Sequence, residues 1–326
     1  WAGIAAALGA RHRTELETER LLTTPRHYAY LKISEGCNWK CGYCAIPLIR
    51  GPHVSVPMET LLEEARKLAA RGVREIMVIA QDTTYYGIDL YGRRRLAELL
   101  TALCRIDDIE WIRLHYAYPT AFPDDVIDVM ASEPKICKYL DIPFQHISDR
   151  MLTAMKRRHT KADALALIER LRERISDIAL RTTLLVGYPT ETEQDMQELE
   201  QFVRDVRFDR LGVFAYSEEE GTYSARELRD DVPEEEKQRR VDRIMRLQEG
   251  ISLENNLARV GRTMRVIVDS RQGDYYVARS QYDSPEVDQE ILIPAAAHQL
   301  RRGHFYDARI TAAEDYDLYG EVVPRR

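Results

Sequence analysis

The chain of 326 residues is 44% hydrophobic and 31% charged, a globular composition with room for one large domain and one small domain. Its net charge of -7 gives no indication of a nucleic-acid partner. No apolar run reaches the length of a membrane span, and the apolar residues 1–10 lack the basic n-region of a signal peptide. The sequence therefore predicts a protein with no membrane segment and a cytoplasmic location.

Strand and helix signals alternate from residue 28 to residue 216. Six apolar runs are expected to form strands, at 28–33, 75–80, 111–115, 139–143, 179–187 and 210–216. Segments with helical spacing lie between them, at 57–72, 95–106, 124–131, 148–155, 162–175 and 193–206. This alternation predicts an α/β fold with a parallel sheet, a partial (β/α)6 barrel whose chemistry lies at the carboxyl ends of its strands.

Three of the five cysteines, Cys37, Cys41 and Cys44, follow the first predicted strand at spacings of four and three residues. Thiolates are soft ligands, so this loop predicts a site for zinc, copper(I) or an iron–sulfur cluster. Structural zinc normally has a fourth Cys or His at short spacing, and the only nearby candidate is His53. Three ligands leave one iron of a 4Fe-4S cluster open to a small molecule, and the sequence favours this cluster. A zinc knuckle and three unrelated core thiols remain as alternatives.

The remaining cysteines, Cys104 and Cys137, are expected to be small buried hydrophobic residues. An odd number of cysteines, three of them clustered as ligands, argues against a disulfide framework. A reducing compartment fits this pattern.

Polar residues follow several of the predicted strands. Gln81 comes after the second strand, Gln145 after the fourth and Glu191 after the fifth. Because the carboxyl ends of parallel strands share one face with the cysteine loop, these three residues are candidates for cofactor or substrate contact. The plainer explanation is loop or cap chemistry, as for Thr192, which is a suitable N-cap for the next helix.

From residue 233 to residue 257 the pattern is that of one charged helix, expected to connect two domains and to present a solvated face. After Gly261 the apolar period changes to two, and short strands at 264–268, 275–279, 290–293, 305–310 and 318–323 predict a small five-stranded antiparallel β-barrel. Residues 259–326 hold ten arginines and eleven acidic residues. This balance lacks the basic stripe that binding along a phosphate backbone requires.

The cysteine loop, with Gly36 before its first Cys and Tyr43 before its third, resembles the radical S-adenosylmethionine superfamily. The resemblance implies that Cys37, Cys41 and Cys44 hold a 4Fe-4S cluster and that S-adenosylmethionine fills its open iron site. Tyr43 would then lie against the adenine. An electron from the cluster would cleave the sulfonium, and the resulting 5'-deoxyadenosyl radical would abstract hydrogen from a substrate.

Segments over nearly the whole chain resemble the methylthiotransferases within that superfamily, namely residues 33–37, 44–51, 141–146 and 186–192. Residues 116–119 and 279–288 resemble the branch that acts on ribosomal small-subunit protein twelve, and the branch acting on transfer-RNA adenosine is the alternative. The resemblance implies transfer of a methylthio group to the β-carbon of an aspartate. One S-adenosylmethionine would supply the radical and another the methyl group. The radical is needed because an unactivated C–H bond resists acid–base chemistry.

On this resemblance, residues 23–258 form the radical domain and residues 259–326 a TRAM domain, which is usually an RNA-binding module. The implied partners are ribosomal small-subunit protein twelve, on or off the ribosome, and an electron donor. The charge balance of the TRAM domain does not favour an RNA contact. Full-length members also carry an N-terminal domain that binds a second 4Fe-4S cluster. Residues 1–22 are expected to be a linker remnant of that domain, with the second cluster only there.

Overall fold

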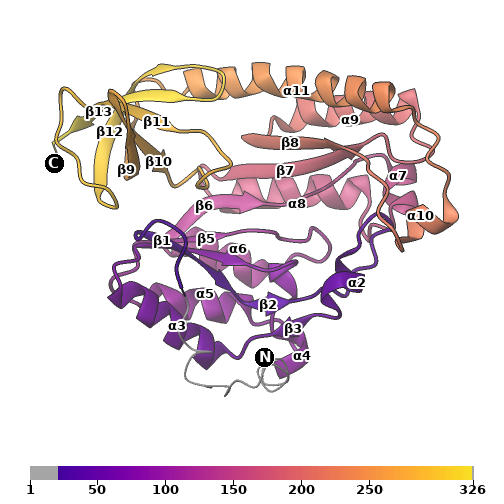
Figure 1. Ribbon diagram of the computed structural model, residues 1–326, viewed down its shortest axis with the longest axis horizontal. Coiled ribbons are helices and arrows are strands. Elements are labelled where there is room, and N and C mark those ends of the chain that lie inside the picture. Colours follow the sequence, from indigo (N-terminus) through magenta and orange to yellow (C-terminus); the bar gives the residue numbers. More distant parts are fainter. Residues whose placement is uncertain (1–20, 325–326) are drawn as a thin grey trace, which may run out of the picture.

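The computed structural model describes residues 21–324, and its larger unit is built on a six-stranded sheet (Figure 1). The strands run in the order β1-β4-β5-β6-β7-β8, and every neighbouring pair is parallel. Their bounds are β1 Tyr28–Lys32, β4 Glu75–Ile79, β5 Trp111–Leu114, β6 Ile136–Asp141, β7 Ala179–Val186 and β8 Arg210–Ala215. The sheet stays open between β1 and β8, so the expected partial (β/α)6 barrel is confirmed.

Five helices pack on the outer face of this sheet: α3 Met58–Ala70, α5 Leu96–Cys104, α6 Asp124–Ser132, α8 Lys161–Arg174 and α9 Glu193–Val206. Every second strand residue, such as Ala29 and Leu31 in β1 or Ile76 in β4, belongs to the core that these helices share. The alternate side chains therefore face the concave side of the partial barrel. Thr160 and Thr192 each begin a helix with a complete capping box, which explains why α8 and α9 start where they do.

Shorter elements shape the remaining loops: β2 Ser34–Glu35, α2 Ile46–Arg50, β3 Val54–Ser55, the 3-10 helix η2 Thr83–Tyr85, α4 Ile88–Tyr91, α7 Asp149–Ala154 and α10 Tyr223–Glu227. The strand expected at 139–143 is wrong at its start, because β6 begins at Ile136. The charged Lys138 interrupts the apolar pattern of the strand in the sequence. In the structure its Nζ turns back and donates to the carbonyl oxygen of Glu133 at 3.2 Å. Within residues 21–324, no helix is both long and apolar enough to cross a membrane.

The smaller unit is a closed barrel of five strands, at the upper left of Figure 1. Its strands are β9 Thr263–Gln272, β10 Tyr275–Ser280, β11 Ile291–Pro294, β12 Phe305–Ala313 and β13 Leu318–Val323, closed in the order β10-β11-β13-β12-β9. The expected barrel is confirmed, with one correction: β11 and β13 are parallel, while the other four pairs are antiparallel. A closed ring with an odd number of strands cannot alternate direction throughout, so at least one pair must be parallel.

Helix α11, Glu234–Leu257, runs along β8 and α9 and leads into the small barrel (Figure 1). Near its end Asn256 donates to the carbonyl oxygen of Glu314 at 3.0 Å, so the helix contacts both units. The interpretation of its charges as a solvated face is wrong for Lys237 and Arg240, which are both buried. They are buried because each has an acidic partner; Lys237 Nζ, for example, lies 2.6 Å from an oxygen of Asp230.

A buried ionic cluster holds the small barrel against the amino-terminal end of the large one; we call this contact the seam. Arg113 of β5 and Glu75 of β4 are fully buried, and Arg113 Nε donates to Glu75 Oε1 at 2.9 Å. Arg279 of β10 donates to the other oxygen of Glu75 at 2.7 Å. Burial acts to raise the pKa of Glu75, but Arg279 and Arg113 outweigh it and hold that pKa below its usual value. Glu75 is therefore an ionised carboxylate shared between the two barrels.

The seam predicts a large cost for removing one of its charges. Arg113→Met leaves Glu75 buried with one guanidinium instead of two, and we expect the free energy of unfolding to fall by about 3–5 kcal/mol in urea titrations. Lys67→Ala is the control, because Lys67 pairs with Glu63 on the exposed face of α3, and no measurable change is expected. A loss below about 1 kcal/mol for Arg113→Met would contradict the role given to the seam.

Candidate active site

The three clustered cysteines lie in the loop between β2 and α2, which follows the carboxyl end of β1. Cys37, Cys41 and Cys44 are all free and all partly buried. The loop turns tightly, because the backbone N–H of Cys44 donates to the carbonyl oxygen of Cys41 at 3.1 Å. Gly36 opens the loop with φ +75°, and a Cβ there would lie 2.1 Å from the carbonyl oxygen of Pro52. Only glycine fits this close approach, so the residue before the first cysteine is set by the fold.

The donor set of this loop fits a soft metal centre. Burial raises the pKa of Cys37 to about 11 and also raises that of Cys44, so a bound metal would have to displace these protons. Within the part of the chain that the structure describes, no three Cys, His, Asp or Glu side chains converge on a single metal ion. His53 instead places its Nε2 3.0 Å from the hydroxyl oxygen of Ser55. A 4Fe-4S cluster binds each thiolate through a different iron, so its ligands need not converge on one point.

An arginine and three aromatic rings border the cysteine loop. Arg157 follows α7, and its Nη1 lies 3.6 Å from Cys41 Sγ and 3.5 Å from Tyr43 Oη. Its guanidinium lies 4.3 Å from the centre of the Tyr118 ring, which stacks on Trp39 with a centroid distance of 4.1 Å. Burial raises the pKa of Tyr43, so its phenol is neutral. The loop thus has a permanent positive charge beside one thiol and an aromatic wall around it.

Two of the expected site residues follow the carboxyl ends of β4 and β6. Gln81 Nε2 donates to Glu35 Oε1 at 3.0 Å, which places it beside the start of the cysteine loop. Gln145 bridges β6 to β7 through its backbone, with its N–H donating to Thr183 at 2.9 Å and its carbonyl accepting from Leu185 at 2.7 Å. Its φ of +70° is a left-handed conformation that non-glycine residues rarely adopt and that is common at functional sites.

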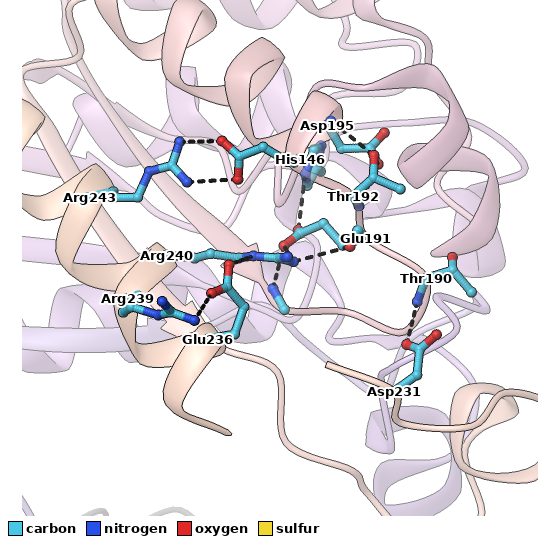
Figure 2. Close-up of polar contacts among 12 residues, drawn as sticks. His146, Thr190, Glu191, Thr192, Asp195, Asp231, Glu236, Arg239, Arg240 and Arg243 are labelled. Atoms are coloured by element: carbon cyan, nitrogen blue, oxygen red, sulfur yellow. Dashed lines mark hydrogen bonds and ion pairs between the residues drawn. The ribbon is translucent and has the colours of Figure 1, made fainter. Parts of the chain in front are cut away.

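The third expected residue, Glu191, is buried in the network drawn in Figure 2. Its Oε2 accepts from Arg240 Nη1 at 2.6 Å and from the backbone N–H of Gly187 at 2.7 Å. Its Oε1 lies 3.2 Å from His146 Nε2. Because His146 Nδ1 accepts from two backbone N–H groups, the proton of this ring lies on Nε2, which is near Glu191 Oε1 but makes no hydrogen bond to it. Of the two carboxylate oxygens only Oε2 is hydrogen-bonded within the described residues, and a contact of Glu191 with cofactor or substrate stays a prediction.

Sequence spacing gave no sign that Arg157 and Tyr118 border the cysteine loop. They lie 116 and 77 residues from Cys41 along the chain, and only the fold brings them within 4 Å of its sulfur. The available signal for Tyr118 was its position after the third predicted strand, at the same face as the cysteines. Arg157 had no such signal, because it follows a short helix and not a strand.

Comparison with known proteins agrees with this geometry. The model of the radical SAM superfamily matches residues 31–203, and a TRAM domain model matches residues 260–323. The ribosomal protein uS12 methylthiotransferase RimO of Bacteroides thetaiotaomicron is 52% identical over 323 residues, which are 99% of this chain and 74% of the relative. The chain belongs to this methylthiotransferase family of the radical SAM superfamily. The protein of the same name from Porphyromonas gingivalis is 54% identical over 324 residues, 99% of this chain and 75% of the relative.

Solved structures support the same fold. Coproporphyrinogen III oxidase (HemN) from Escherichia coli, described as a radical SAM enzyme, aligns with a TM-score of 0.50 and 15% identity over 82% of this chain and 69% of its own. Membership of the superfamily implies a 4Fe-4S cluster and S-adenosylmethionine. The cysteine loop supplies the soft donors that such a cluster takes.

The buried pair of Glu191 and Arg240 predicts strong energetic coupling. Arg240→Met strands the buried carboxylate of Glu191, which costs about 3–5 kcal/mol, whereas Glu191→Gln leaves Arg240 paired with Glu236 at 2.9 Å and costs less. The double variant strands neither charge. We expect a double-mutant cycle of urea unfolding to give a coupling energy above about 1 kcal/mol. Arg239→Met is the control on the same helix, because the Arg239 side chain is 72% exposed and little change is expected. Additive losses in the cycle would contradict the network.

Proposed function

We propose that this chain is the catalytic core of an enzyme that attaches a methylthio group to the β-carbon of an aspartate in ribosomal protein uS12. The observation that carries the proposal is the 52–54% identity to uS12 methylthiotransferases over 99% of the chain, together with three free cysteines in one strand-end loop. Transfer-RNA adenosine is not favoured as the substrate, because ten arginines against eleven acidic residues give the TRAM domain no basic excess.

In this proposal Cys37, Cys41 and Cys44 hold the 4Fe-4S cluster. When bound, the cluster and S-adenosylmethionine supply the one-electron chemistry that removes hydrogen from an unactivated carbon. The chain's own residues prepare the place for it. The thiols are partly buried, and Arg157 sets a fixed positive charge beside Cys41 Sγ, which offsets the charge of a thiolate ligand.

The remaining proposed contacts lie at the strand ends. We place Tyr43 against the adenine of S-adenosylmethionine, because its ring adjoins Cys44 and its phenol is close to Arg157. Gln81 and Gln145 offer amide groups to cofactor or substrate from the ends of β4 and β6. Glu191 belongs to the same face, where it accepts the N–H of Gly187 and lies beside the ring of His146.

We infer a radical domain of residues 23–258 and a TRAM domain of residues 259–326. Residues 1–20 lie outside the described residues, so the linker expected over 1–22 stays a prediction. The family matches at 31–203 and 260–323 and the end of α11 at Leu257 support this division. The proposed partners are uS12 and an electron donor, in the cytoplasm where ribosomes assemble. A second cluster would take its ligands from elsewhere, because the remaining cysteines, Cys104 and Cys137, are both buried in the fold.

The ligand assignment predicts the iron content of variants. Cys37→Ala, Cys41→Ala and Cys44→Ala, made in this chain, should each lose the cluster after anaerobic reconstitution, so that iron falls from about four atoms per chain to near zero. Cys104→Ala is the matched control and should keep the iron of the wild type. Visible iron–sulfur absorption that persists in any of the first three variants would refute the assignment.

The substrate is tested with the full-length protein, reconstituted with iron and sulfide, reduced, and given S-adenosylmethionine and either uS12 or transfer RNA. Mass spectrometry of digested uS12 should show one aspartate heavier by a methylthio group, and transfer RNA should stay unmodified. Modification of transfer RNA with unchanged uS12 would overturn the proposal and favour the adenosine enzyme.

A further inference from the structure

A segment of the TRAM domain occupies the concave side of the parallel sheet. Residues 281–288, between β10 and β11, leave the small barrel and contact four strands of the large one; we call them the plug loop. Arg113 Nη1 donates to the carbonyl oxygen of Gln281 at 2.7 Å, and Arg210 Nε donates to Asp283 Oδ1 at 3.2 Å. The other contacts join His115 Nε2 to Ser284 Oγ at 3.1 Å, Arg181 Nε to Asp288 Oδ1 at 3.4 Å, and the Tyr28 hydroxyl to Glu286 Oε1 at 2.8 Å.

Alternation along the strands fixes the side of the sheet on which the plug loop lies. Arg113 of β5 and His115, the first residue after this strand, contact the plug, while Ile112 and Leu114 on either side of Arg113 belong to the helix-facing core. The plug loop therefore lies inside the partial barrel, on the side opposite to the helices. Asp283 and Ser284 are buried there, so the plug is an integral part of the interior of the barrel.

A small cavity separates the plug loop from the strand ends. Its volume is about 60 Å³, and its lining includes Tyr30, His115 and Asp141 from the sheet and Ser284, Pro285 and Val287 from the plug loop. The plug side is the floor of this cavity.

The cavity lies inside the partial barrel, on the amino-terminal side of two of the expected site residues. Ile79, which also lines it, is two residues before Gln81, and Asp141 is four residues before Gln145. Tyr116, at the carboxyl end of β5, lines the cavity and is 48% exposed. A side chain in this cavity would point from the strand ends toward the plug loop.

We propose that the plug loop is the floor of the substrate cavity, and that the TRAM domain thereby selects a short acidic side chain of a peptide over a nucleobase. This inference rests on the proposed function and attributes the selection of its substrate to the plug loop. Size supports it: a cavity of about 60 Å³ is well below the ~150 Å³ of an engineered cavity that holds benzene. The four heavy atoms of an aspartate side chain are of this scale, and the ten ring and amino atoms of adenine are not.

The chemistry of the lining agrees with a carboxylate ligand. Arg181 is the arginine that lines the cavity, and its side chain is 19% exposed although it pairs with Asp141 at 3.0 Å. The Ser284 hydroxyl lies on the floor, next to His115, whose pKa burial lowers to about 3. His115 is therefore neutral at physiological pH, so a substrate carboxylate would share Arg181 with Asp141 and with Asp288, whose Oδ1 lies 3.4 Å from Arg181 Nε.

A second cavity adjoins the first and suits the residues that flank the substrate aspartate. It measures about 320 Å³ and shares Arg181 and Val287 with the smaller one. Its charged lining consists of Asp209, Asp288 and Asp317 together with Arg181 and Arg210. This slight acidic excess fits a basic segment of a ribosomal protein better than a phosphate backbone.

Cross-linking tests the contact directly and does not depend on turnover. In the full-length protein, p-benzoylphenylalanine replaces Val287, which is 59% exposed and lines both cavities, and the protein is irradiated with uS12. The control carries the same group at Val260, which is 42% exposed in the same domain but lines neither cavity. We expect a cross-link to uS12 from position 287 and none from position 260. No cross-link from position 287, or equal yields from both positions, would overturn the proposal.

Filling the floor tests its role in the reaction. In the reconstituted full-length protein, Val287→Trp should lower methylthiolation of uS12 at least tenfold, while iron content and cleavage of S-adenosylmethionine to 5'-deoxyadenosine stay at wild-type levels. Val287→Ala should keep most of the activity. Wild-type rates for Val287→Trp would overturn the proposal. A wild-type protein that leaves uS12 unmodified would instead overturn the proposed function, and the cross-link from position 287 then decides whether the plug loop contacts uS12.

Discussion

One buried carboxylate links the two halves of this molecule. Glu75 comes from the second strand of the parallel sheet, and the guanidinium groups around it come from Arg113 in the same sheet and from Arg279 in the small barrel. A buried charge without its partner is costly, so neither barrel can leave the other without stranding one. Apolar contacts add to this, with the Phe305 ring 4.8 Å from that of Trp111, but hydrophobic packing is not directional. The ionic contacts therefore set how the TRAM domain is oriented.

Buried charges that are paired across distant segments also occur at the opposite end of the strands. There a buried glutamate, Glu191, is held by Arg240 from α11, and a buried arginine, Arg157, lies among Tyr43, Tyr118 and a cysteine sulfur. In each case the charge comes from a segment far away in the chain. Loops that must hold a cofactor need rigid support, and charges buried with their partners supply it through distance and direction. Polar residues at the strand ends thus serve the fold and the site together.

The sequence could predict the features that depend on interactions between residues close together in the chain. Helix α9 and strand β13 are predicted to the residue, because a capping box at Thr192 and an alternating apolar run are local signals. The cysteine loop is local in the same sense. The parallel pair of β11 and β13 is not, since it follows from closing a ring of five strands. Arg157 beside Cys41 and the plug loop beneath Arg113 join residues more than a hundred positions apart, where no spacing rule applies.

The charge count of the TRAM domain does not describe the charge that its surface presents. Ten arginines against eleven acidic residues give the net charge of the domain, but Arg279 in the seam and Asp283 in the plug loop are buried and cannot contact a binding partner. Asp283 neutralises Arg210 of the large barrel, so part of the acidity of the domain is used to hold the plug loop in place. What a substrate meets at the floor of the cavity is a hydroxyl, a proline ring and a valine. Selection of the substrate at this floor depends on the space that these groups leave. The same radical chemistry at the cysteine loop could act on another substrate if the plug loop had another shape.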